Sequence, residues 1–475
     1  MFPQLRPYQT DYTSHTNQFF QSVDNQWLLL VMPTGTGKTT VFSSLVQGWS
    51  AQEKKVLIVV HRVELVDQIV DRLATFGVTA GVLASKYPVN LDLPVQVGMI
   101  QALSNNLSWY PDYIVIDECH HSVADSYTQL WGQFESSKIL GVTATPVRMD
   151  GEGFSDLYQL LLNLYPLDYF FNNEYLVRPI HFFCSTINPK FLKEVNGEYN
   201  ITEQAKFLIQ NNSINNVVQT YQKYSPGKKG VVFAANVGHS KMLVERFNQM
   251  GISAAHICGK IPKDERKEIV SKFRQGKYSI LCNYDIVSEG FDVPDIDTVL
   301  LARRTKSLAT YIQQVGRCLR PDKQNGKRNG FVLDCSGQWL EFGFAGLDYP
   351  WQLDMNKDIV LKEMEKQKLF IRDRKGKIKS ICEDPRELEG LNLVAAEQEL
   401  QRTSRYEALL YERNPDDNFL SHEDAMEAFL TYSDWMDLVG YKWTTFELRY
   451  IEMRMNMFGA TIPTKDKNKI LEMTL

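Results

Sequence analysis

A glycine- and threonine-rich stretch near the N-terminus has the composition of a phosphate-binding loop. Residues 33–40 read Pro-Thr-Gly-Thr-Gly-Lys-Thr-Thr and follow an apolar run, Trp27–Met32, that predicts a buried strand. Glycines let backbone N–H groups close around phosphate oxygens, and the positive end of a following helix strengthens this contact. We therefore expect Lys38 to reach the outer phosphates of a nucleotide and the Thr39 hydroxyl to bind Mg²⁺. The residues expected to line this loop are Thr34, Gly35, Thr36, Gly37, Lys38, Thr39 and Thr40.

The match to the strict phosphate-loop pattern is incomplete. That pattern, G-x-x-x-x-G-K-[ST], places glycine at the position that Met32 occupies in this chain. The alternative interpretation is a plain Gly/Thr-rich turn, and a second motif is needed to decide between the two.

Two adjacent carboxylates supply that second motif, about 80 residues further along the chain. Asp117 and Glu118 stand at the end of an apolar run that begins at Tyr113. Asp117 is placed to hold the Mg²⁺ with its hydration shell, and Glu118 to orient or deprotonate an attacking water. One acidic pair at a strand end is commonly only a cap. Its combination with the loop at residues 33–40 predicts a site for nucleotide hydrolysis.

These motifs need a sheet to position them, and the apolar pattern predicts one. Up to about residue 338, short β-branched runs alternate with amphipathic stretches, which is typical of parallel strands in α/β domains. We expect two α/β domains, at residues 1–165 and 175–338, with a linker at 165–179. A small, mainly helical domain is expected at 345–475. The expected strands are Trp27–Met32, Val56–Val60, Val95–Ile100, Tyr113–Asp117, Ile139–Thr143, His181–Thr186, Gly230–Ala235, Ala254–Cys258, Ser279–Cys282, Thr298–Ala302 and Phe331–Asp334.

Nine segments, in order along residues 3–337, resemble the motifs of the superfamily 2 helicases. Such a set in the right order is far more specific than any single member. The segments are Leu5–Gln9, Thr34–Thr39, His61–Leu65 with Gln68, Val97–Leu103, Asp117–His120, Thr143–Thr145, Val231–Asn236, Ser288–Asp292 and Gln313–Arg320.

The resemblance implies two RecA-like domains with ATP in the cleft between them and single-stranded nucleic acid across their top. It implies that Gln9 reads the adenine, with Arg6 nearby. The other residues that the resemblance adds to the ATP site are His120, Gly290 and Asp292. The residues that we expect to contact the nucleic-acid strand are Arg62, Gln101, Asn236, Ser288 and Thr305.

The last segment carries two arginines whose spacing suggests a catalytic role. Gln313, Arg317 and Arg320 are spaced i, i+4 and i+7, which predicts a single helix face. Gly316 between them would allow close approach to the other domain. Arginines aimed from the second domain at a nucleotide on the first act as arginine fingers, which stabilise charge on the transferring phosphoryl group.

The motif variants resemble the DNA-directed branch that contains XPB-like, type III restriction-like and phage UvsW-like helicases. The chain has His61-Arg-Val-Glu-Leu65, Asp-Glu-Cys-His at 117–120 and Gln313, where DEAD-box RNA helicases differ. We therefore expect an ATP-dependent DNA helicase or translocase that acts on branched or partly single-stranded DNA in replication, recombination or repair. Two alternatives stay open: an RNA helicase, and a nucleic-acid-stimulated ATPase that acts as a sensor or scaffold without unwinding.

Charge and cysteine content are compatible with these functions. The 475 residues carry a net charge of −5, but residues 341–475 hold 19 basic and 26 acidic side chains, so the preceding part is slightly positive at +2. The acidic tail is more suited to a protein partner than to DNA, apart from its basic run Arg372–Lys379. That run is equally compatible with duplex phosphate contacts and with a solvated hairpin.

Seven isolated cysteines indicate reduced thiols, as in the cytoplasm of a bacterium or phage-infected cell. The chain shows no apolar run long enough for a membrane helix. No nuclease-like acidic cluster is evident after residue 340. The aromatic residues expected in the core of the tail, or else stacked on bases, are Trp435, Tyr441, Trp443, Phe446 and Tyr450.

Overall fold

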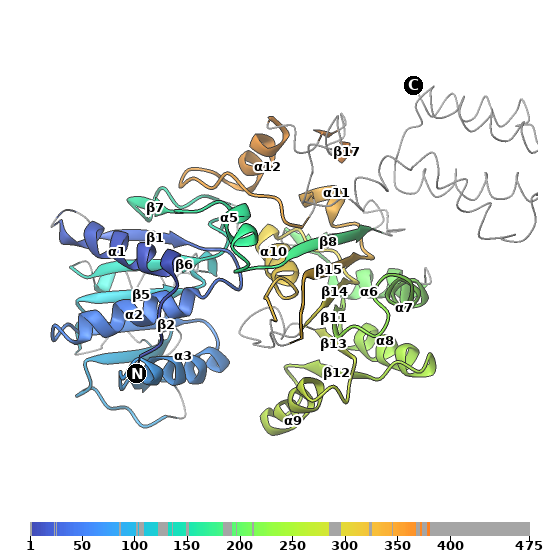
Figure 1. The fold of residues 1–475 in the computed structure, drawn as a ribbon, viewed down its shortest axis with the longest axis horizontal. Helices are drawn as coiled ribbons and strands as arrows, with labels where there is room; N and C mark the ends of the chain where they lie inside the picture. The colour runs from blue at the N-terminus through green and yellow to red at the C-terminus, as the bar shows by residue number, and fades with distance from the viewer. Residues whose placement is uncertain are drawn as a thin grey trace, which may run out of the picture.

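The computed structural model describes residues 2–380, with gaps. The gaps are residues 23, 25, 85–86, 101–102, 104–108, 122–131, 135, 149–151, 184–191, 196, 211–212, 285–295, 323–324, 344, 367–370 and 373–377. Four expected site residues, Gln101, Ser288, Gly290 and Asp292, therefore lie outside the described residues, as do the aromatic residues of the tail. Figure 1 shows two α/β units side by side, domain 1 in blue to teal and domain 2 in green to yellow.

Domain 1 contains a seven-stranded sheet in the order β3-β4-β2-β5-β6-β1-β7, and all of its strand pairs are parallel. The central strands are apolar on both faces because helices or loops cover both sides of the sheet. Leu28 and Leu30 belong to one core cluster, and Leu29 and Val31 to the cluster on the opposite face. The strands are β1 Trp27–Val31, β2 Val56–Val60, β3 Gly81–Leu83, β4 Val95–Met99, β5 Tyr113–Asp117, β6 Lys138–Thr143 and β7 Leu160–Leu162.

Helices of domain 1 cover the face that carries Leu28 and Leu30. The third helix buries Leu65, Ile69 and Leu73, which are spaced to form one apolar stripe. The helices of this domain and of the connection that follows it are α1 Pro7–Gln21, α2 Lys38–Ser50, α3 Val63–Thr75, the 3₁₀ turn Cys119–His121 and α5 Leu167–Asn172.

Domain 2 repeats the plan with a six-stranded, fully parallel sheet in the order β12-β13-β11-β14-β15-β8. The small antiparallel hairpin β9–β10 lies between β8 and the first helix of the domain. The strands are β8 Arg178–Phe183, β9 Glu194–Val195, β10 Glu198–Tyr199, β11 Gly230–Phe233, β12 Ala254–Cys258, β13 Ile280–Tyr284, β14 Thr298–Leu301 and β15 Asn329–Asp334. The helices are α6 Ile201–Gln210, α7 Ser213–Tyr224, α8 Val237–Gln249, α9 Lys263–Arg274 and α10 Leu308–Gly316.

The expected fold class, two tandem RecA-like α/β domains, is confirmed. Each of the eleven expected strands overlaps a strand of the structure. The sequence pattern did not indicate β3 or β7, since each has only three residues, nor the two-residue strands of the β9–β10 hairpin. Within the expected linker, residues 165–179, the chain forms helix α5 and then enters β8.

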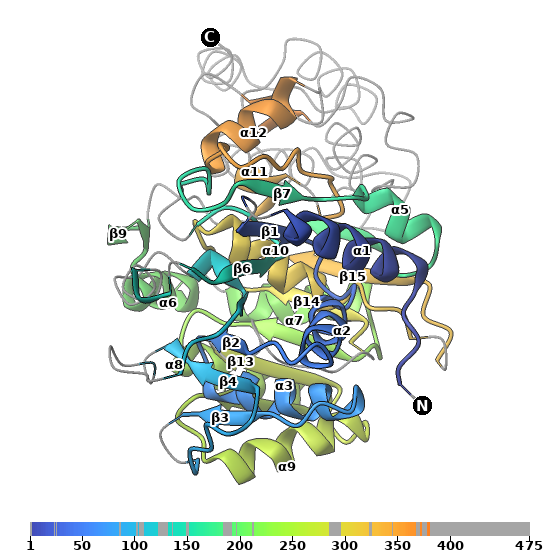
Figure 2. The same ribbon diagram turned by 90° about the vertical axis from the view of Figure 1, so that its left-hand side faces the viewer.

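After β15 the chain turns back toward domain 1. Helix α11, Trp339–Phe342, is followed by an irregular segment, residues 345–355, which we call the strap, and by α12, Lys357–Lys366. At one end of the strap the Ala345 N–H donates to His181 Nδ1 of domain 2 at 3.0 Å. At the other end the Phe154 N–H of domain 1 donates to the Leu353 carbonyl at 2.6 Å. The strap therefore connects the two domains a second time; Figure 2 shows this region above both sheets.

The domains also touch at the edge far from the strap. Lys263 of α9 donates to Asp67 of α3 at 2.8 Å, and the Tyr87 hydroxyl donates to the same carboxylate at 2.6 Å. The hydrogen bond from Lys263 is the main reason that the pKa of Asp67 lies below its usual value. Both charged side chains are about half exposed, so this pair is a weak contact.

Beyond α12, strands β16 Ile371–Arg372 and β17 Ile378–Ser380 pair antiparallel, and they flank the centre of the basic run. No helix in the described part of the chain is both long and apolar enough to span a bilayer. Among the described residues, Cys119, Cys258, Cys282, Cys318 and Cys335 are buried and form no disulfide bond.

Candidate nucleotide site between the two domains

The phosphate loop has the backbone shape that its sequence predicts. Gly35 and Gly37 both have a φ of +89°, a left-handed conformation that favours glycine. Helix α2 begins directly afterwards at Lys38, so the N–H groups of its first turn point into the loop. Met32, which replaces the first glycine of the strict pattern, is fully buried in the domain core. A core side chain thus fills that position, and the loop after it keeps its form.

The N-terminal segment packs directly on this loop. The Gln9 amide donates to the Thr36 carbonyl at 3.2 Å, and the Tyr8 hydroxyl donates to the same carbonyl at 2.6 Å. The Arg6 N–H donates to Gln9 Oε1 at 3.0 Å, and its guanidinium lies 5.2 Å from the ring centre of Tyr175. The structure therefore brings Arg6 and Gln9 to the loop. Sequence reasoning overlooked Tyr8, although it stands inside the same motif.

The paired acids lie across the loop from Lys38. Asp117 ends β5 and is only 6% exposed, and Glu118 follows it with a φ of +49°. A left-handed conformation is unfavourable for glutamate, and such strain is concentrated at functional sites. Glu118 Oε1 lies 4.0 Å from Lys38 Nζ. The lysine that follows β1 and the acids at the end of β5 therefore meet at the carboxyl edge of the sheet, where β6 lies between these two strands.

A chain of hydrogen bonds runs from these acids across the domain boundary. The Gln313 amide of domain 2 donates to Glu118 Oε2 at 3.5 Å and contacts His120 Nε2 at 3.3 Å. His120 Nδ1 contacts the Thr143 hydroxyl at 3.0 Å, and that hydroxyl donates to the Thr145 carbonyl at 3.1 Å. These roles are consistent if His120 is neutral with its proton on Nδ1. Residues from three motifs and both domains thus form one connected network.

The arginines of the last motif are not arranged as expected. Helix α10 ends at Gly316, so the prediction that Gln313, Arg317 and Arg320 share one helix face is wrong. Arg317 is the C-cap residue, and the backbone after it tightens into turns with hydrogen bonds three residues apart. Arg320 precedes Pro321, and a residue before proline disfavours the helical conformation.

Arg320 nevertheless reaches the other domain, and Arg317 is buried. Arg317 is 6% exposed. Arg320 lies over the phosphate loop, because a Cβ placed on Gly35 would be 3.0 Å from Arg320 Cγ. An irregular turn, and not a helix face, therefore brings a domain 2 arginine to the loop of domain 1.

The close approach expected at Gly316 is present, and it yields a prediction. A Cβ at this position would lie 2.6 Å from the Cβ of Thr34, which is too close for two carbon atoms. Gly316→Ala is expected to push α10 away from the phosphate loop and to lower kcat for ATP hydrolysis roughly 10-fold or more. Steady-state ATPase assays on the purified chain measure this.

Gly48→Ala is the matched control, because a Cβ there, within α2, meets no atom within 4 Å. It is expected to leave kcat unchanged and to stabilise the helix by about 0.5–1 kcal/mol. Equal ATPase rates for Gly316→Ala and Gly48→Ala would show that the contact between Gly316 and Thr34 does not matter for turnover.

The loop fits a magnesium nucleotide by its donors. The Thr34 hydroxyl is buried and makes no hydrogen bond within the described residues, so an acceptor such as a phosphate oxygen would satisfy it. No group of three or more His, Cys, Asp or Glu side chains in the described part of the chain could hold a metal. An ion beside Asp117 and Thr39 would therefore complete its shell with phosphate and water oxygens, which is how Mg²⁺ is commonly bound.

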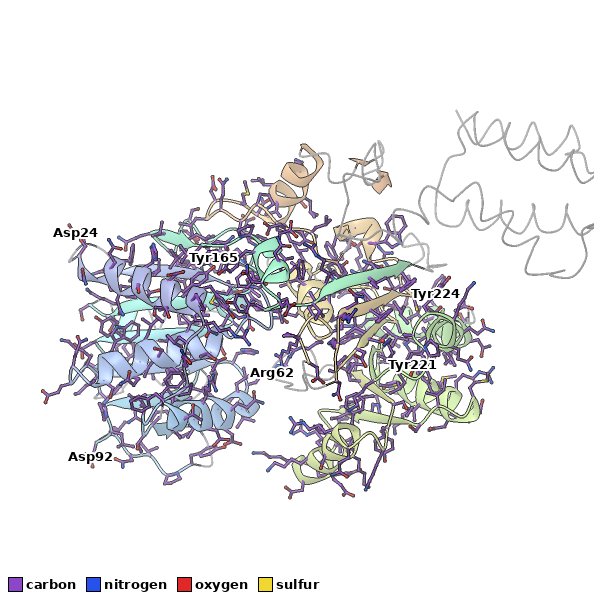
Figure 3. All side chains as sticks on the ribbon, viewed as in Figure 1. Asp24, Arg62, Asp92, Tyr165, Tyr221 and Tyr224 are labelled. Carbon is purple, nitrogen blue, oxygen red and sulfur yellow. The ribbon has the colours of Figure 1, made fainter. Side chains whose placement is uncertain are left out.

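The residues that were expected to contact the nucleic-acid strand differ in their surroundings. Arg62 is half-buried and lies on the side of domain 1 that faces domain 2 (Figure 3). Asn236 caps α8, where its side-chain oxygen accepts from the His239 N–H at 2.8 Å. Thr305 is only 1% exposed, and its hydroxyl donates to Glu198 at 2.5 Å. Because this hydroxyl is buried, it cannot contact a nucleic-acid strand, and the prediction for Thr305 is wrong.

His239, which follows Asn236 in the first turn of α8, is expected to make domain 2 sensitive to acid. His239 is fully buried, and its Nδ1 accepts from the Ala235 N–H at 3.2 Å. Burial lowers the pKa of His239 to about 4. Because the unfolded chain takes up this proton near pH 6.5, the free energy of unfolding is expected to fall by about 2 kcal/mol between pH 7 and pH 5 from this group. The effect is absent above the unfolded pKa and complete below pH 4.

Urea unfolding of the wild type and of His239→Gln at both pH values measures this contribution. The variant is expected to lose about 2 kcal/mol less than the wild type on acidification, whatever its own stability at pH 7. His15→Gln, on the exposed side of α1, should behave as the wild type does. The same pH dependence in wild type and His239→Gln would contradict the assignment.

Comparison with known proteins agrees with this geometry. A family model described as "Type III restriction enzyme, res subunit" matches residues 2–148, and one described as "Helicase conserved C-terminal domain" matches residues 211–322. A 51.5 kDa protein of a Lactococcus phage (isolate 7-9) is 31% identical over 326 residues, which are 68% of this chain and 69% of that protein.

Other relatives are more distant or longer. IRC3 of Saccharomyces cerevisiae, assigned as an ATP-dependent helicase, is 30% identical over 70% of this chain, and the match spans only 52% of IRC3. The DNA 3'-5' translocase XPB2 of Sulfurisphaera tokodaii is 24% identical over 62% of this chain and 74% of that protein.

The fold is also found among solved structures. A fragment assigned as an HsdR subunit of a type I restriction enzyme from Vibrio vulnificus YJ016 superposes with a TM-score of 0.56, at 20% identity, over 73% of this chain and 68% of that one. The chain belongs to the superfamily 2 helicases, which are nucleic-acid-dependent ATPases, among their type III restriction-like and XPB-like members.

Proposed function

We propose that this chain is an ATP-dependent DNA helicase or translocase. It couples ATP hydrolysis to movement on, or remodelling of, branched or partly single-stranded DNA in replication, recombination or repair. The observation that carries the proposal is the contact of Gln313 with Glu118 and His120, at 3.5 and 3.3 Å. Because this contact joins the two domains at the acid assigned to hydrolysis, the state of the nucleotide is coupled to the relative position of the domains.

Each side chain around the loop has a distinct part in hydrolysis. Lys38 would offset negative charge on the outer phosphates, and Asp117 with Thr39 would hold the metal ion. Mg²⁺, when bound, supplies further positive charge beside the phosphates. Glu118 orients a water or takes its proton. Arg320, with Arg317, stabilises the charge that develops on the transferred group, as arginine fingers do.

Closure of the domains links this chemistry to a nucleic-acid strand. A nucleotide that contacts both domains favours the closed form, and hydrolysis removes part of that contact. Strand contacts are proposed for Arg62, Gln101, Asn236 and Ser288, and base contact of the nucleotide for Gln9 with Arg6. The proposed ATP site also includes Gly290 and Asp292. If the closed form and the form after hydrolysis contact different nucleotides of the nucleic-acid strand, the protein would move along that strand in each cycle.

DNA is favoured over RNA by the motif variants and by the relatives. The family model for domain 1 is that of a restriction enzyme subunit, and XPB2 is named as a DNA translocase. His61 and Gln313 stand where DEAD-box RNA helicases carry other residues. Because residues 341–475 carry a net charge of −7, that part of the chain is proposed to contact a protein partner.

An ATPase and strand-displacement panel over single-stranded, forked and four-way DNA and single-stranded RNA tests the proposal. We expect DNA to stimulate ATP hydrolysis, and a Lys38→Ala preparation serves as the inactive control. Absence of stimulation by any DNA would refute the DNA assignment, and stimulation by RNA alone would favour an RNA helicase. Hydrolysis without unwinding or translocation on any fork would favour the sensor function.

A further inference from the structure

The loop that leads into helix α10 is fixed by buried hydrogen bonds. The Thr305 N–H donates to Gln338 Oε1 at 2.7 Å, and the Gln338 amide donates to the Thr305 carbonyl at 2.9 Å. Arg304 donates to the carbonyls of Ser336 and Gly337 at 3.0 and 2.8 Å. These bonds tie the backbone between β14 and α10 to the end of β15, independently of the β9–β10 hairpin.

Glu198 of the hairpin holds the last part of that loop. Its carboxylate accepts from the Lys306 N–H at 2.9 and 3.1 Å and from the Thr305 hydroxyl at 2.5 Å. The Tyr199 N–H also donates to it, at 2.8 Å. The Lys306 ammonium forms an ion pair with Glu194 on the other strand of the hairpin. The hairpin therefore contacts the loop through both of its strands.

The carboxylate stands at the beginning of α10. Ser307 is the N-cap, where its hydroxyl accepts from the Thr310 N–H at 3.2 Å and its own N–H donates to the Thr305 hydroxyl at 3.1 Å. Thr305 and Lys306, which both donate hydrogen bonds to Glu198, are therefore the two residues just before this cap. A negative charge beside a helix N-terminus is also favourable electrostatically.

The position of α10 matters because its contact with the acids is at the limit of hydrogen-bond length. Gln313 lies about one and a half turns along the helix and reaches Glu118 Oε2 at 3.5 Å. A hydrogen bond is lost when a contact of this length grows by a few tenths of an ångström. A nine-residue helix moves as a rigid unit, so a small shift at Thr305 or Lys306 is transmitted to Gln313.

We propose that Glu198 is a positioning residue for ATP hydrolysis: from the β9–β10 hairpin it fixes the start of α10, so that Gln313 reaches Glu118 and His120. This inference rests on the proposed function and deepens it. Glu198 itself touches neither Glu118 nor His120 in the described hydrogen bonds, and it acts through the helix. The proposal also accounts for the burial of Thr305, whose hydroxyl bridges Glu198 and Ser307.

The first test compares Glu198→Ala with Glu198→Gln in the full chain at saturating DNA. Glu198→Ala is expected to lower kcat about 10-fold while leaving the affinity for a fluorescent ADP analogue unchanged, since the phosphate loop is untouched. Glu198→Gln keeps an acceptor for the Lys306 N–H and should retain kcat within about 3-fold of the wild type. Glu203→Ala, an exposed glutamate of α6 paired with Lys193, is the matched control.

The second test asks whether Glu198 acts through Gln313. If it does, Glu198→Ala combined with Gln313→Ala should have the same kcat as Gln313→Ala alone. Multiplied effects in the double variant, or a wild-type kcat for Glu198→Ala, would overturn the proposal. If Glu198→Ala does not fold, Thr305→Val, which removes only the bridging hydroxyl, gives the same comparison. A wild-type chain that hydrolyses no ATP would refute the proposed function and this inference together. If the wild type is active, the kcat values of the Glu198 variants test this inference alone.

Discussion

Glu118→Gln is expected to lower the rate of ATP hydrolysis by about 10²–10⁴-fold while ATP still binds. Glutamine has the shape of glutamate, so the left-handed turn at this residue and its contact with Gln313 can remain. The amide, however, cannot accept a proton from water. Lys38, 4.0 Å away in the wild type, stays available for the phosphates. The variant is therefore expected to accumulate bound ATP.

Single-turnover hydrolysis and equilibrium binding of radiolabelled ATP separate the two effects. Asp156→Asn, which neutralises an exposed acid of domain 1 paired with Arg148, is the control and should hydrolyse ATP at the wild-type rate. If Glu118→Gln turned over ATP nearly as fast as the wild type, another group would have to activate the water.

Arg320→Ala is expected to have an effect of similar size, about 10³-fold on kcat, without a matching loss of ADP affinity. Arg320 belongs to domain 2, yet its side chain lies against Gly35 of the phosphate loop. Its positive charge would therefore stand beside the phosphates only when the domains are together. ADP lacks the transferred group, so its binding to the loop depends little on this arginine.

Arg320→Lys distinguishes charge from geometry. Lysine keeps the charge but not the planar fork of donors, and we expect it to recover only a small part of the lost rate. Arg274→Ala, at an exposed position at the end of α9, is the control for removing a domain 2 arginine. A wild-type kcat for Arg320→Ala would exclude it as an arginine finger.

Much of the fold could be predicted because buried parallel strands leave a simple pattern. Val56–Val60 is apolar along its length, Tyr113–Asp117 is apolar up to its final acid, and the predicted and observed bounds of both are the same. The phosphate loop and the paired acids were also recognisable, since their chemistry depends on residues adjacent in the chain. The structure brings Lys38, Glu118 and Gln313 together as this interpretation requires.

What could not be predicted depends on contacts between distant residues. Thr305 is a short polar residue of the kind expected to contact a nucleic-acid strand. Its hydroxyl instead donates a hydrogen bond to Glu198, 107 residues earlier in the chain, and its side chain is buried. The end of α10 at Gly316 is set by local turns and by packing on Thr34, and no helical period could reveal it. The return of the strap to domain 1 follows from the fit of Leu353 beside Gly153, where a side chain would collide.

The strap has a mechanical consequence for the motor. The α5 segment joins the domains covalently, and the strap, which continues from domain 2, is held on domain 1 by the hydrogen bond from Phe154 to Leu353. Both connections lie on the same side of the molecule (Figures 1 and 2). Two attachment points define an axis, so the domains pivot about one line and do not drift apart in all directions. The largest displacement is then expected at the opposite edge, where the half-exposed Lys263–Asp67 ion pair joins the domains. The two domains are therefore expected to open and close by rotation about the side that carries α5 and the strap, with the weak contact between α3 and α9 at the edge that opens.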